Sequence, residues 1–544
     1  MPQSEAKTTS LESCVVPAAA PTPVVPAAPA TNPYIGILGV FLGAGLATLS
    51  ARLLGIGLAD LRGARGFGVD EASWIPTALN MATMFSGVFV VFVNSLLGPR
   101  RILLPAAAIF TFVSAITPLV PGYWPMLLLS VIAGLASGTF YSLTMTFVLT
   151  SLPKRLIIFG IAAYAADIVF VSNIATLLEG WYIEHLSWPW IFWTAAVATP
   201  VMFLCVYFGI PRRKPSGPTP SWRGFAYFSA SLALIYGALD QGERLDWLNS
   251  GVIVAMLAGG GVLFIAACMR RLVQPNPTLN LSFLNRRNTV LMALAIFVFK
   301  FVHLSVIILI PAFLSTIQGY RPLQTGHALA WVAVPMFALV WLVAWIVIRS
   351  NSRLTLALGL TVVAFVSWIC SRIDSAWAGN NFKVLELVVS LGLACSYVGL
   401  VSSIVLEGLE AGALTSAANA ATFSGLMHFI RLFGGEIGVA GMNRLITVRE
   451  RFHDNAIGLH VQAGNWLTDD RLRMLSGGLF SGSSSSDEAQ SRAVGMLSQQ
   501  VRAQAYTMAI SDGFIVICWM VVVYLLLLLF LRRPKFSYKE LSKL

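Results

Sequence analysis

Charged residues are scarce in this chain of 544 residues. Only 11% are Asp, Glu, Lys or Arg, whereas 57% are hydrophobic, and soluble domains carry about 25% charged residues. The apolar residues gather into blocks of about 20, the length that a helix needs to cross a bilayer. The short alternating segments of a transmembrane barrel are a different pattern. The sequence therefore predicts an all-α integral membrane protein.

Catalytic and metal-binding motifs are missing as well. The six cysteines stand mostly inside apolar blocks and have no CxxC spacing, so neither a disulfide framework nor a metal site is indicated. The sequence has no Walker A motif, no HExxH, no GxSxG and no haem-type ligand pair. We therefore expect neither an enzyme nor a cofactor. Energy for any transport would come from an ion gradient, a substrate gradient or another subunit.

The basic charge of the chain has a membrane explanation. A net formal charge of +12 would suggest nucleic acid in a soluble protein, but membrane proteins gather Lys and Arg in their cytoplasmic loops. About fourteen apolar blocks can be counted, and alternate loops are basic, beginning with Arg100, Arg101, Lys154 and Arg155. We predict fourteen transmembrane helices, both termini in the cytoplasm and no nucleic-acid partner.

Three segments fall outside the apolar blocks. Residues 1–33 are rich in Pro and Ala without a secretory pattern, which predicts a disordered cytoplasmic tail. Residues 211–223 form a Pro, Gly and basic linker. Residues 447–508 predict a long outer loop whose low-complexity centre is flanked by sequences that fit short amphipathic helices. A loop of that length is usually either functional or disordered, and both readings stay open.

Ionisable residues inside the apolar blocks are the candidates for function, because they are costly there. Asp167 lies near the middle of the fifth block and can take up a proton, although a permanent ion pair is the alternative. His303 is a candidate because histidine side chains ordinarily titrate near neutral pH, although a satisfied hydrogen bond between helices is the commoner role. Glu436 is a third proton-coupling candidate.

Basic residues inside the blocks are candidates for the substrate cavity. Lys300 stands three residues before His303 and shares its helix face. His428 and Arg431 repeat this spacing in the thirteenth block, although Arg431 is also compatible with a structural role. Arg52 interrupts the first block in "ATLSARLLGIGLAD". A buried carboxylate should form an ion pair with Arg52, and we expect this carboxylate to be Asp167.

Several stretches, in their order and spacing, resemble one transporter family. They are "NSLLGPRRILL" (94–104), "WPWIFW" (188–193), "ALDQGERLDWLNS" (238–250), "NPTLNLSFLNRRNT" (276–289) and "FIRLFGGEIGVAGMNRL" (429–445). Together they are similar to the fourteen-helix drug:proton antiporters of the major facilitator superfamily, the EmrB/QacA type. The resemblance implies a major facilitator fold with a six-helix bundle over 34–210, two inserted helices over 224–268, a second six-helix bundle over 289–532 and a cytoplasmic tail over 533–544.

The resemblance also implies a conformational loop at Gly98, Arg100 and Arg101, where the glycine allows a tight turn and the arginines can bridge to helix C-termini. Ser95 stands there in place of the family's acidic residue. Arg52 likewise falls where related first helices carry an acidic motif. Several residues that the family uses for proton coupling are thus replaced.

We therefore expect a proton-coupled exporter of hydrophobic or amphipathic compounds in a bacterial inner membrane, working by alternating access and needing only the proton gradient. The family implies that the outer loop can meet a periplasmic membrane-fusion adaptor that leads to an outer-membrane channel. Two alternatives remain, a transporter of one anionic metabolite and a transport-inactive scaffold or sensor.

Overall fold

The structure is a computed structural model that describes residues 32–153, 156–212, 222–273, 287–410, 417–479, 485–530 and 538. Most of the predicted N-terminal tail, most of the linker 211–223 and nearly all of the C-terminal tail lie outside these residues. Within the described ranges every regular element is a helix and none is a strand. The predicted all-α fold class is confirmed.

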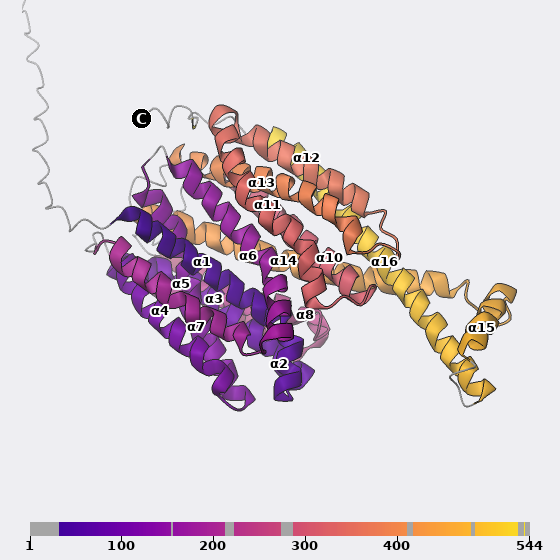
Figure 1. Ribbon diagram of the computed structural model, residues 1–544. Coiled ribbons are helices and arrows are strands. Elements are labelled where there is room, and N and C mark those ends of the chain that lie inside the picture. Colours follow the sequence, from indigo (N-terminus) through magenta and orange to yellow (C-terminus); the bar gives the residue numbers. More distant parts are fainter. Residues whose placement is uncertain are drawn as a thin grey trace, which may run out of the picture.

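The first half of the chain forms one group of long helices (Figure 1). They are α1 (Pro33–Ile56), the short α2 (Leu58–Arg65), α3 (Val69–Leu97), α4 (Pro99–Ile116) with the 3-10 turn η1 (Thr117–Leu119), α5 (Tyr123–Ser151), α6 (Ile157–His185) and α7 (Trp190–Gly209). Small residues let these helices touch through their backbones. At Gly209 an added Cβ would lie 2.0 Å from the backbone nitrogen of Gly36, so α1 and α7 meet without intervening side chains.

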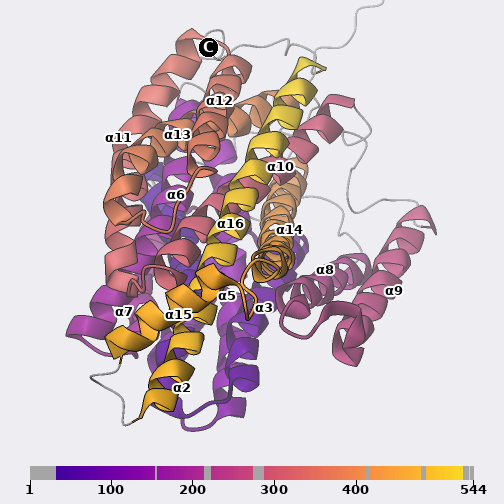
Figure 2. The same cartoon turned by 90° about the vertical axis from the view of Figure 1, so that its right-hand side faces the viewer.

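The second half contributes the remaining helices. They are α8 (Trp222–Gly242), the 3-10 turn η3 (Trp247–Asn249), α9 (Gly251–Val273), α10 (Arg287–Thr316), α11 (Pro322–Arg349), α12 (Ser352–Cys370), α13 (Gly379–Glu410), α14 (Ala417–Gly458), α15 (Trp466–Leu479) and α16 (Ser486–Leu529). Figure 2 shows α8 and α9 at one side of the bundle, with α8 next to α3 and α14.

The two halves meet most closely along α6 and α11. A Cβ at Gly180 would lie 2.2 Å from the backbone nitrogen of Leu323, and one at Gly326 would lie 2.4 Å from the Cα of Leu177. Such backbone contact requires glycine, because any side chain would force the helices apart. The halves are therefore closed against each other at this end of α6.

Twelve helices in the described ranges are long and apolar enough to cross a membrane. α8 and α14 are not among these twelve, although both pack against them, so a count of fourteen spans stays a prediction. Large apolar side chains are exposed on the outside of the bundle, including Phe112, Val197 and Val262. Such a surface is suited to contact with lipid.

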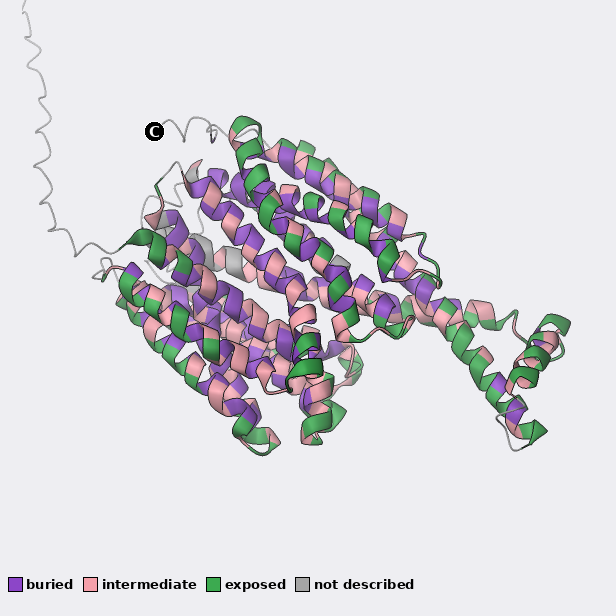
Figure 3. Ribbon diagram, viewed as in Figure 1, coloured by how far each residue is buried: buried purple, intermediate pink, exposed green. Residues whose placement is uncertain are grey.

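The predicted outer loop 447–508 is largely helical. α14 continues to Gly458 and α16 begins at Ser486, so the two helices extend beyond the bundle and carry α15 at their far end (Figure 1). Asp512 on α16 joins them, since its Oδ2 lies 2.6 Å from Nε of Arg449 and 2.7 Å from Nε2 of His453. Much of this extension is exposed (Figure 3). The sequence predicts short helices on either side of the low-complexity segment, but two of them are continuations of the long helices α14 and α16.

Candidate functional site

A cavity of about 570 Å³ lies between the two halves of the chain. Its walls come from α1, α3, α5 and α6 of the first half and from α8, α10 and α14 of the second. Four of the predicted site residues line it: Arg52, Lys300, Arg431 and Glu436. Residues that lie up to 384 positions apart in the sequence, as Arg52 and Glu436 do, are thus brought to one space.

Arg52 faces this cavity because of its place on α1. The lining positions of α1 recur at helical spacing, as Ala47, Thr48, Ala51, Arg52, Gly55 and Ile56. The acidic side chains within electrostatic reach of the guanidinium include Tyr236 on α8 and Glu436 on α14. The positive charge of Arg52, in the first apolar block, therefore lies close to acidic side chains from the second half of the chain.

Asp167 is placed differently from our expectation. Its neighbours Ile168 and Ser172 line the cavity, whereas its carboxylate packs against α1, where a Cβ at Gly45 would lie 2.6 Å from Oδ1. The cation within its electrostatic reach is Arg431. The expected Arg52–Asp167 pair is therefore wrong, because Arg52 stands two helical turns beyond Gly45 and the carboxylate within its electrostatic reach is Glu436.

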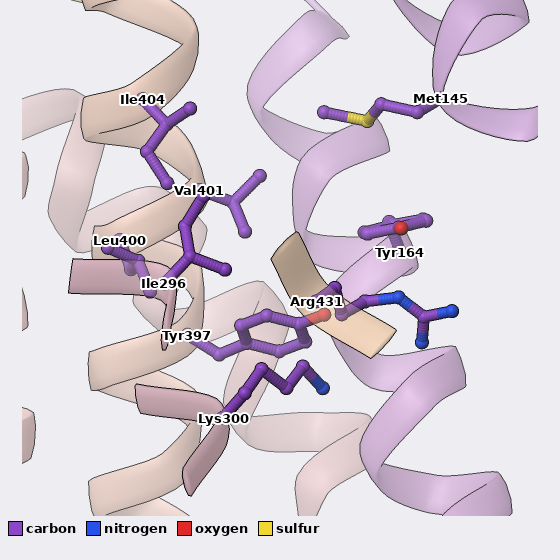
Figure 4. Close-up of a pocket in the computed structure, with 9 residues that line it drawn as sticks. All are labelled: Met145, Tyr164, Ile296, Lys300, Tyr397, Leu400, Val401, Ile404 and Arg431. Atoms are coloured by element: carbon purple, nitrogen blue, oxygen red, sulfur yellow. The ribbon is translucent and has the colours of Figure 1, made fainter. Parts of the chain in front are cut away.

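Arg431 and Lys300 both lie against aromatic rings. The Arg431 guanidinium is 3.4 Å from the ring centre of Tyr141, and the Lys300 ammonium is 5.0 Å from that of Tyr397. Such cation–π contacts stabilise cations that have left water. Figure 4 shows both residues around a smaller space of about 40 Å³, which is bounded mainly by apolar side chains and by Tyr164 and Tyr397.

Of the two histidine candidates, His303 is buried beside an aromatic ring. His303 is fully buried, and its ring stacks on Phe299 with centroids 5.8 Å apart. Neither ring nitrogen of His303 has a hydrogen-bond partner among the described residues. The side chain of His428 lies outside the described residues.

Sequence reasoning missed an acidic residue of the site. Asp240 was read as part of an outer loop, but α8 runs to Gly242 and places Asp240 on the cavity wall. Its carboxylate accepts a hydrogen bond from Thr77 of α3 and lies within hydrogen-bonding reach of Glu436. The available signal was the apolar block that leads directly into this aspartate.

The predicted conformational loop forms a contact at the opposite end of α3. Gly98 joins α3 to α4 with φ +79°, a conformation that favours glycine. Arg100 donates a hydrogen bond of 3.1 Å to the carbonyl of Ile210, the C-cap of α7, and lies 4.8 Å from the ring centre of Tyr207. Arg101 is exposed. Arg100 is thus the arginine of the two that bridges to a helix C-terminus.

Other buried carboxyl groups lie away from the cavity. Glu179 is fully buried within reach of Asp60, and Glu407 accepts a hydrogen bond of 3.2 Å from Asn288. Glu386 on α13 was missed by the sequence reading. It is 1% exposed, and neither of its carboxyl oxygens has a hydrogen-bond partner in the described part of the chain.

The fold and the inter-half cavity can now be compared with known proteins. The sequence profile of the Major Facilitator Superfamily matches residues 40–439. The chain belongs to this superfamily. Its members are transporters rather than enzymes, and the chain is accordingly a multi-pass membrane protein that transports a small molecule.

Similar proteins place the chain near the EmrB-type exporters. The colistin resistance protein EmrB of Acinetobacter baumannii is 24% identical over 519 residues, covering 93% of this chain and 98% of the relative. The multidrug export protein EmrB of Escherichia coli K12 is 21% identical over 498 residues, covering 90% and 93%. The resemblance seen in the sequence motifs is thereby confirmed.

Solved structures show the same fold at low sequence identity. The proton:xylose symporter XylE matches with a TM-score of 0.52 and 11% identity, over 94% of this chain and 98% of the symporter. The human organic anion transporter MFSD10 matches with a TM-score of 0.51 and 14% identity, over 90% and 99%.

Proposed function

We propose that the chain is a proton-coupled exporter of hydrophobic or amphipathic compounds in the inner membrane of a bacterium. The compound would occupy the cavity between the two halves, and the halves would expose it alternately to each side. The names of the EmrB relatives, which export drugs or confer resistance to colistin, support the direction and the broad substrate class. The cavity carries the proposal.

The size and walls of this cavity suit such compounds. A volume of about 570 Å³ lies within the range of roughly 300–1,000 Å³ that is typical of small-molecule sites. Apolar residues such as Ile168, Ile308 and Val439 alternate with a few charged ones along its walls. An amphipathic compound can bury its apolar part there and present its polar group to the charges.

Proton coupling would require a buried group that binds a proton in one state and releases it in the other. Asp167 lies within electrostatic reach of Arg431, and Glu436 lies within electrostatic reach of Arg52. His303 is the buried imidazole beside Lys300. Proton and substrate would be coupled because each binds the two access states with different affinity.

One observation favours the alternative of a specific anionic substrate. Arg52 and Arg431 both lie within electrostatic reach of Lys300, and three cations around one cavity would suit a carboxylate or phosphate. A chemical panel separates the two functions, because a broad exporter moves compounds of several charge types whereas a metabolite carrier moves one anion and its close analogues.

The extension formed by α14, α15 and α16 supports a proposal about partners. It would project on the outer side and offer a surface for a periplasmic adaptor that leads to an outer-membrane channel. Cross-linking from the exposed face of α15 in intact cells tests this, since an inert extension would give no specific cross-linked product.

The direct test is transport by the purified chain in lipid vesicles with an imposed pH gradient. We expect amphipathic compounds to accumulate only while the gradient is present, and a protonophore to abolish the movement. Asp167→Asn and Glu436→Gln should each insert normally and reduce gradient-driven movement at least about tenfold, if each removes a required proton site. If no compound of any charge type moves, the chain is a scaffold or sensor and the proposal is wrong.

A further inference from the structure

α8 and the turn that follows it contact α14 at three points along the two helices. Phe228 lies edge-on to Phe429 with ring centroids 5.9 Å apart, and at the far end Glu243 forms an ion pair of 3.6 Å with Arg444. Between these contacts, Asp240 of α8 faces Glu436 of α14. The contacts on either side of these two carboxyl groups hold α8 against α14, so the carboxyl groups stay close to each other.

Glu436 has unused hydrogen-bonding capacity at this place. The residue is 7% exposed and lines the cavity, and its Oε1 is covered without a hydrogen-bond partner in the described ranges. Two carboxylates that face each other away from bulk water repel, whereas one shared proton converts them into donor and acceptor. A buried acceptor without a donor is costly, so the arrangement favours a protonated pair.

We propose that Asp240 and Glu436 share a proton and together form one proton-binding site on the cavity wall. This inference rests on the proposed function, and it adds a residue from α8, one of the two helices that the sequence predicts to be inserted. With one proton the pair carries a single negative charge, which the Arg52 guanidinium balances. A second proton, taken from bulk water, makes both carboxyl groups neutral and leaves Arg52 without its counter-charge.

The surrounding groups give the pair a defined electrostatic setting. Tyr236 lies within hydrogen-bonding reach of Glu436, and Thr77 donates to Asp240. Further ionisable side chains lie on the same helices and on those packed around them. They include Arg52 on α1, Tyr141 on α5, Lys300 and His303 on α10, Arg431 on α14, Arg244 just after α8 with its partner Asp70 on α3, and Asp512 on α16 with its partners Arg449 and His453 on α14.

A polar chain leads from the pair to the surface. Arg244 donates a hydrogen bond of 2.6 Å from Nε to Oε1 of Gln241, and Gln241 donates to Thr77 next to Asp240. On its other side Arg244 pairs with Asp70, which is 86% exposed. Water at this end of α3 is therefore connected to the carboxyl pair by side chains of α3 and α8.

Infrared titration of the purified full-length chain tests the pair without any substrate. Protonated carboxylic acids show a carbonyl stretching band that shifts in D2O, and two interacting carboxyl groups titrate in two steps that belong to the pair. We expect wild type minus Asp240→Asn/Glu436→Gln to show two such steps. Each single variant should keep one of them with a displaced midpoint. Asp246→Asn, an exposed change just beyond α8, should match the wild type.

Two outcomes would overturn the inference. In the first, Asp240→Asn leaves the titration of Glu436 at its wild-type midpoint. In the second, the double variant loses no carboxylic acid band. If Asp240→Asn does not fold, Asp240→Glu keeps a carboxyl group on α8 and should keep two steps with moved midpoints. Because the titration needs no transport, a chain that shows the pair but moves no compound contradicts the proposed function alone.

Discussion

The proximity of Asp167 to Arg431, rather than to Arg52, makes a quantitative prediction for Arg431→Met. The change removes a guanidinium that lies 3.4 Å from the ring centre of Tyr141, and a desolvated cation–π contact is worth about 2 kcal/mol. It also leaves the Asp167 carboxylate without the cation in its reach, which costs about 1.5 kcal/mol. The expected loss in the free energy of unfolding is about 3.5 kcal/mol, or more than a hundredfold in the folded-to-unfolded ratio.

Asp167→Asn should partly rescue this variant. Alone, it removes the attraction between the two charges and costs about 1 kcal/mol. In Arg431→Met/Asp167→Asn no buried charge is left unpaired, so the double variant should lose only about 3 kcal/mol instead of the additive 4.5, as a coupled pair requires. The resulting coupling of about 1.5 kcal/mol lies well above the scatter of about 0.5 kcal/mol that is found for independent sites.

The assay is equilibrium unfolding in detergent micelles, followed by the fluorescence of the 15 tryptophans. Arg52→Met serves as the matched control. It should show coupling to Glu436→Gln and none beyond about 0.5 kcal/mol to Asp167→Asn. Coupling of Arg52 to Asp167 that exceeds the coupling of Arg431 to Asp167 would refute the reasoning from the structure.

Three other changes test the fold and its contacts. Gly209→Ala places a Cβ 2.0 Å from a backbone nitrogen of α1 and should lower thermal stability, whereas Gly261→Ala, with open space around it, should raise helix stability by about 0.5–1 kcal/mol. Arg100→Ala should slow transport and destabilise the chain by about 1–2 kcal/mol through the lost carbonyl bond, and the exposed Arg101→Ala should do neither. Asp512→Asn should speed proteolytic cleavage within the extension without changing the bundle, and an unchanged cleavage rate would mean that its ion pairs do not hold the extension together.

Fold class follows from the sequence because its physical cause is local. A block of about 20 apolar residues has to satisfy its own backbone in lipid, and a helix does this within the block. The extension formed by α14 and α16 could not be found in this way. Residues 447–458 and 486–508 are polar, and their helices are stabilised by each other and by contacts such as Asp512 with Arg449.

The sequence predicted several residues of the site, but it did not predict which of them lie close to one another. Arg52, Lys300 and Arg431 stood out because a cation inside an apolar block is costly wherever the block lies. Which carboxylate meets which cation depends on how the helices are rotated and packed, and no single block contains that information. Asp240 was missed because it ends its block beside other charged residues, and Glu386 because it lies near the start of its own.

Arg52 shows what the tertiary structure adds to such a residue. On its own helix it is a cation without a partner, in the place where related helices carry an acidic motif. In the cavity it lies within electrostatic reach of Glu436, which in turn faces Asp240, so α14 and α8 supply acidic groups that α1 lacks. An inverted charge on one helix is compatible with proton coupling when the opposite wall supplies the carboxyl groups. In the proposed mechanism, the protonation state of that wall decides whether Arg52 is neutralised by the protein or is free to attract a substrate.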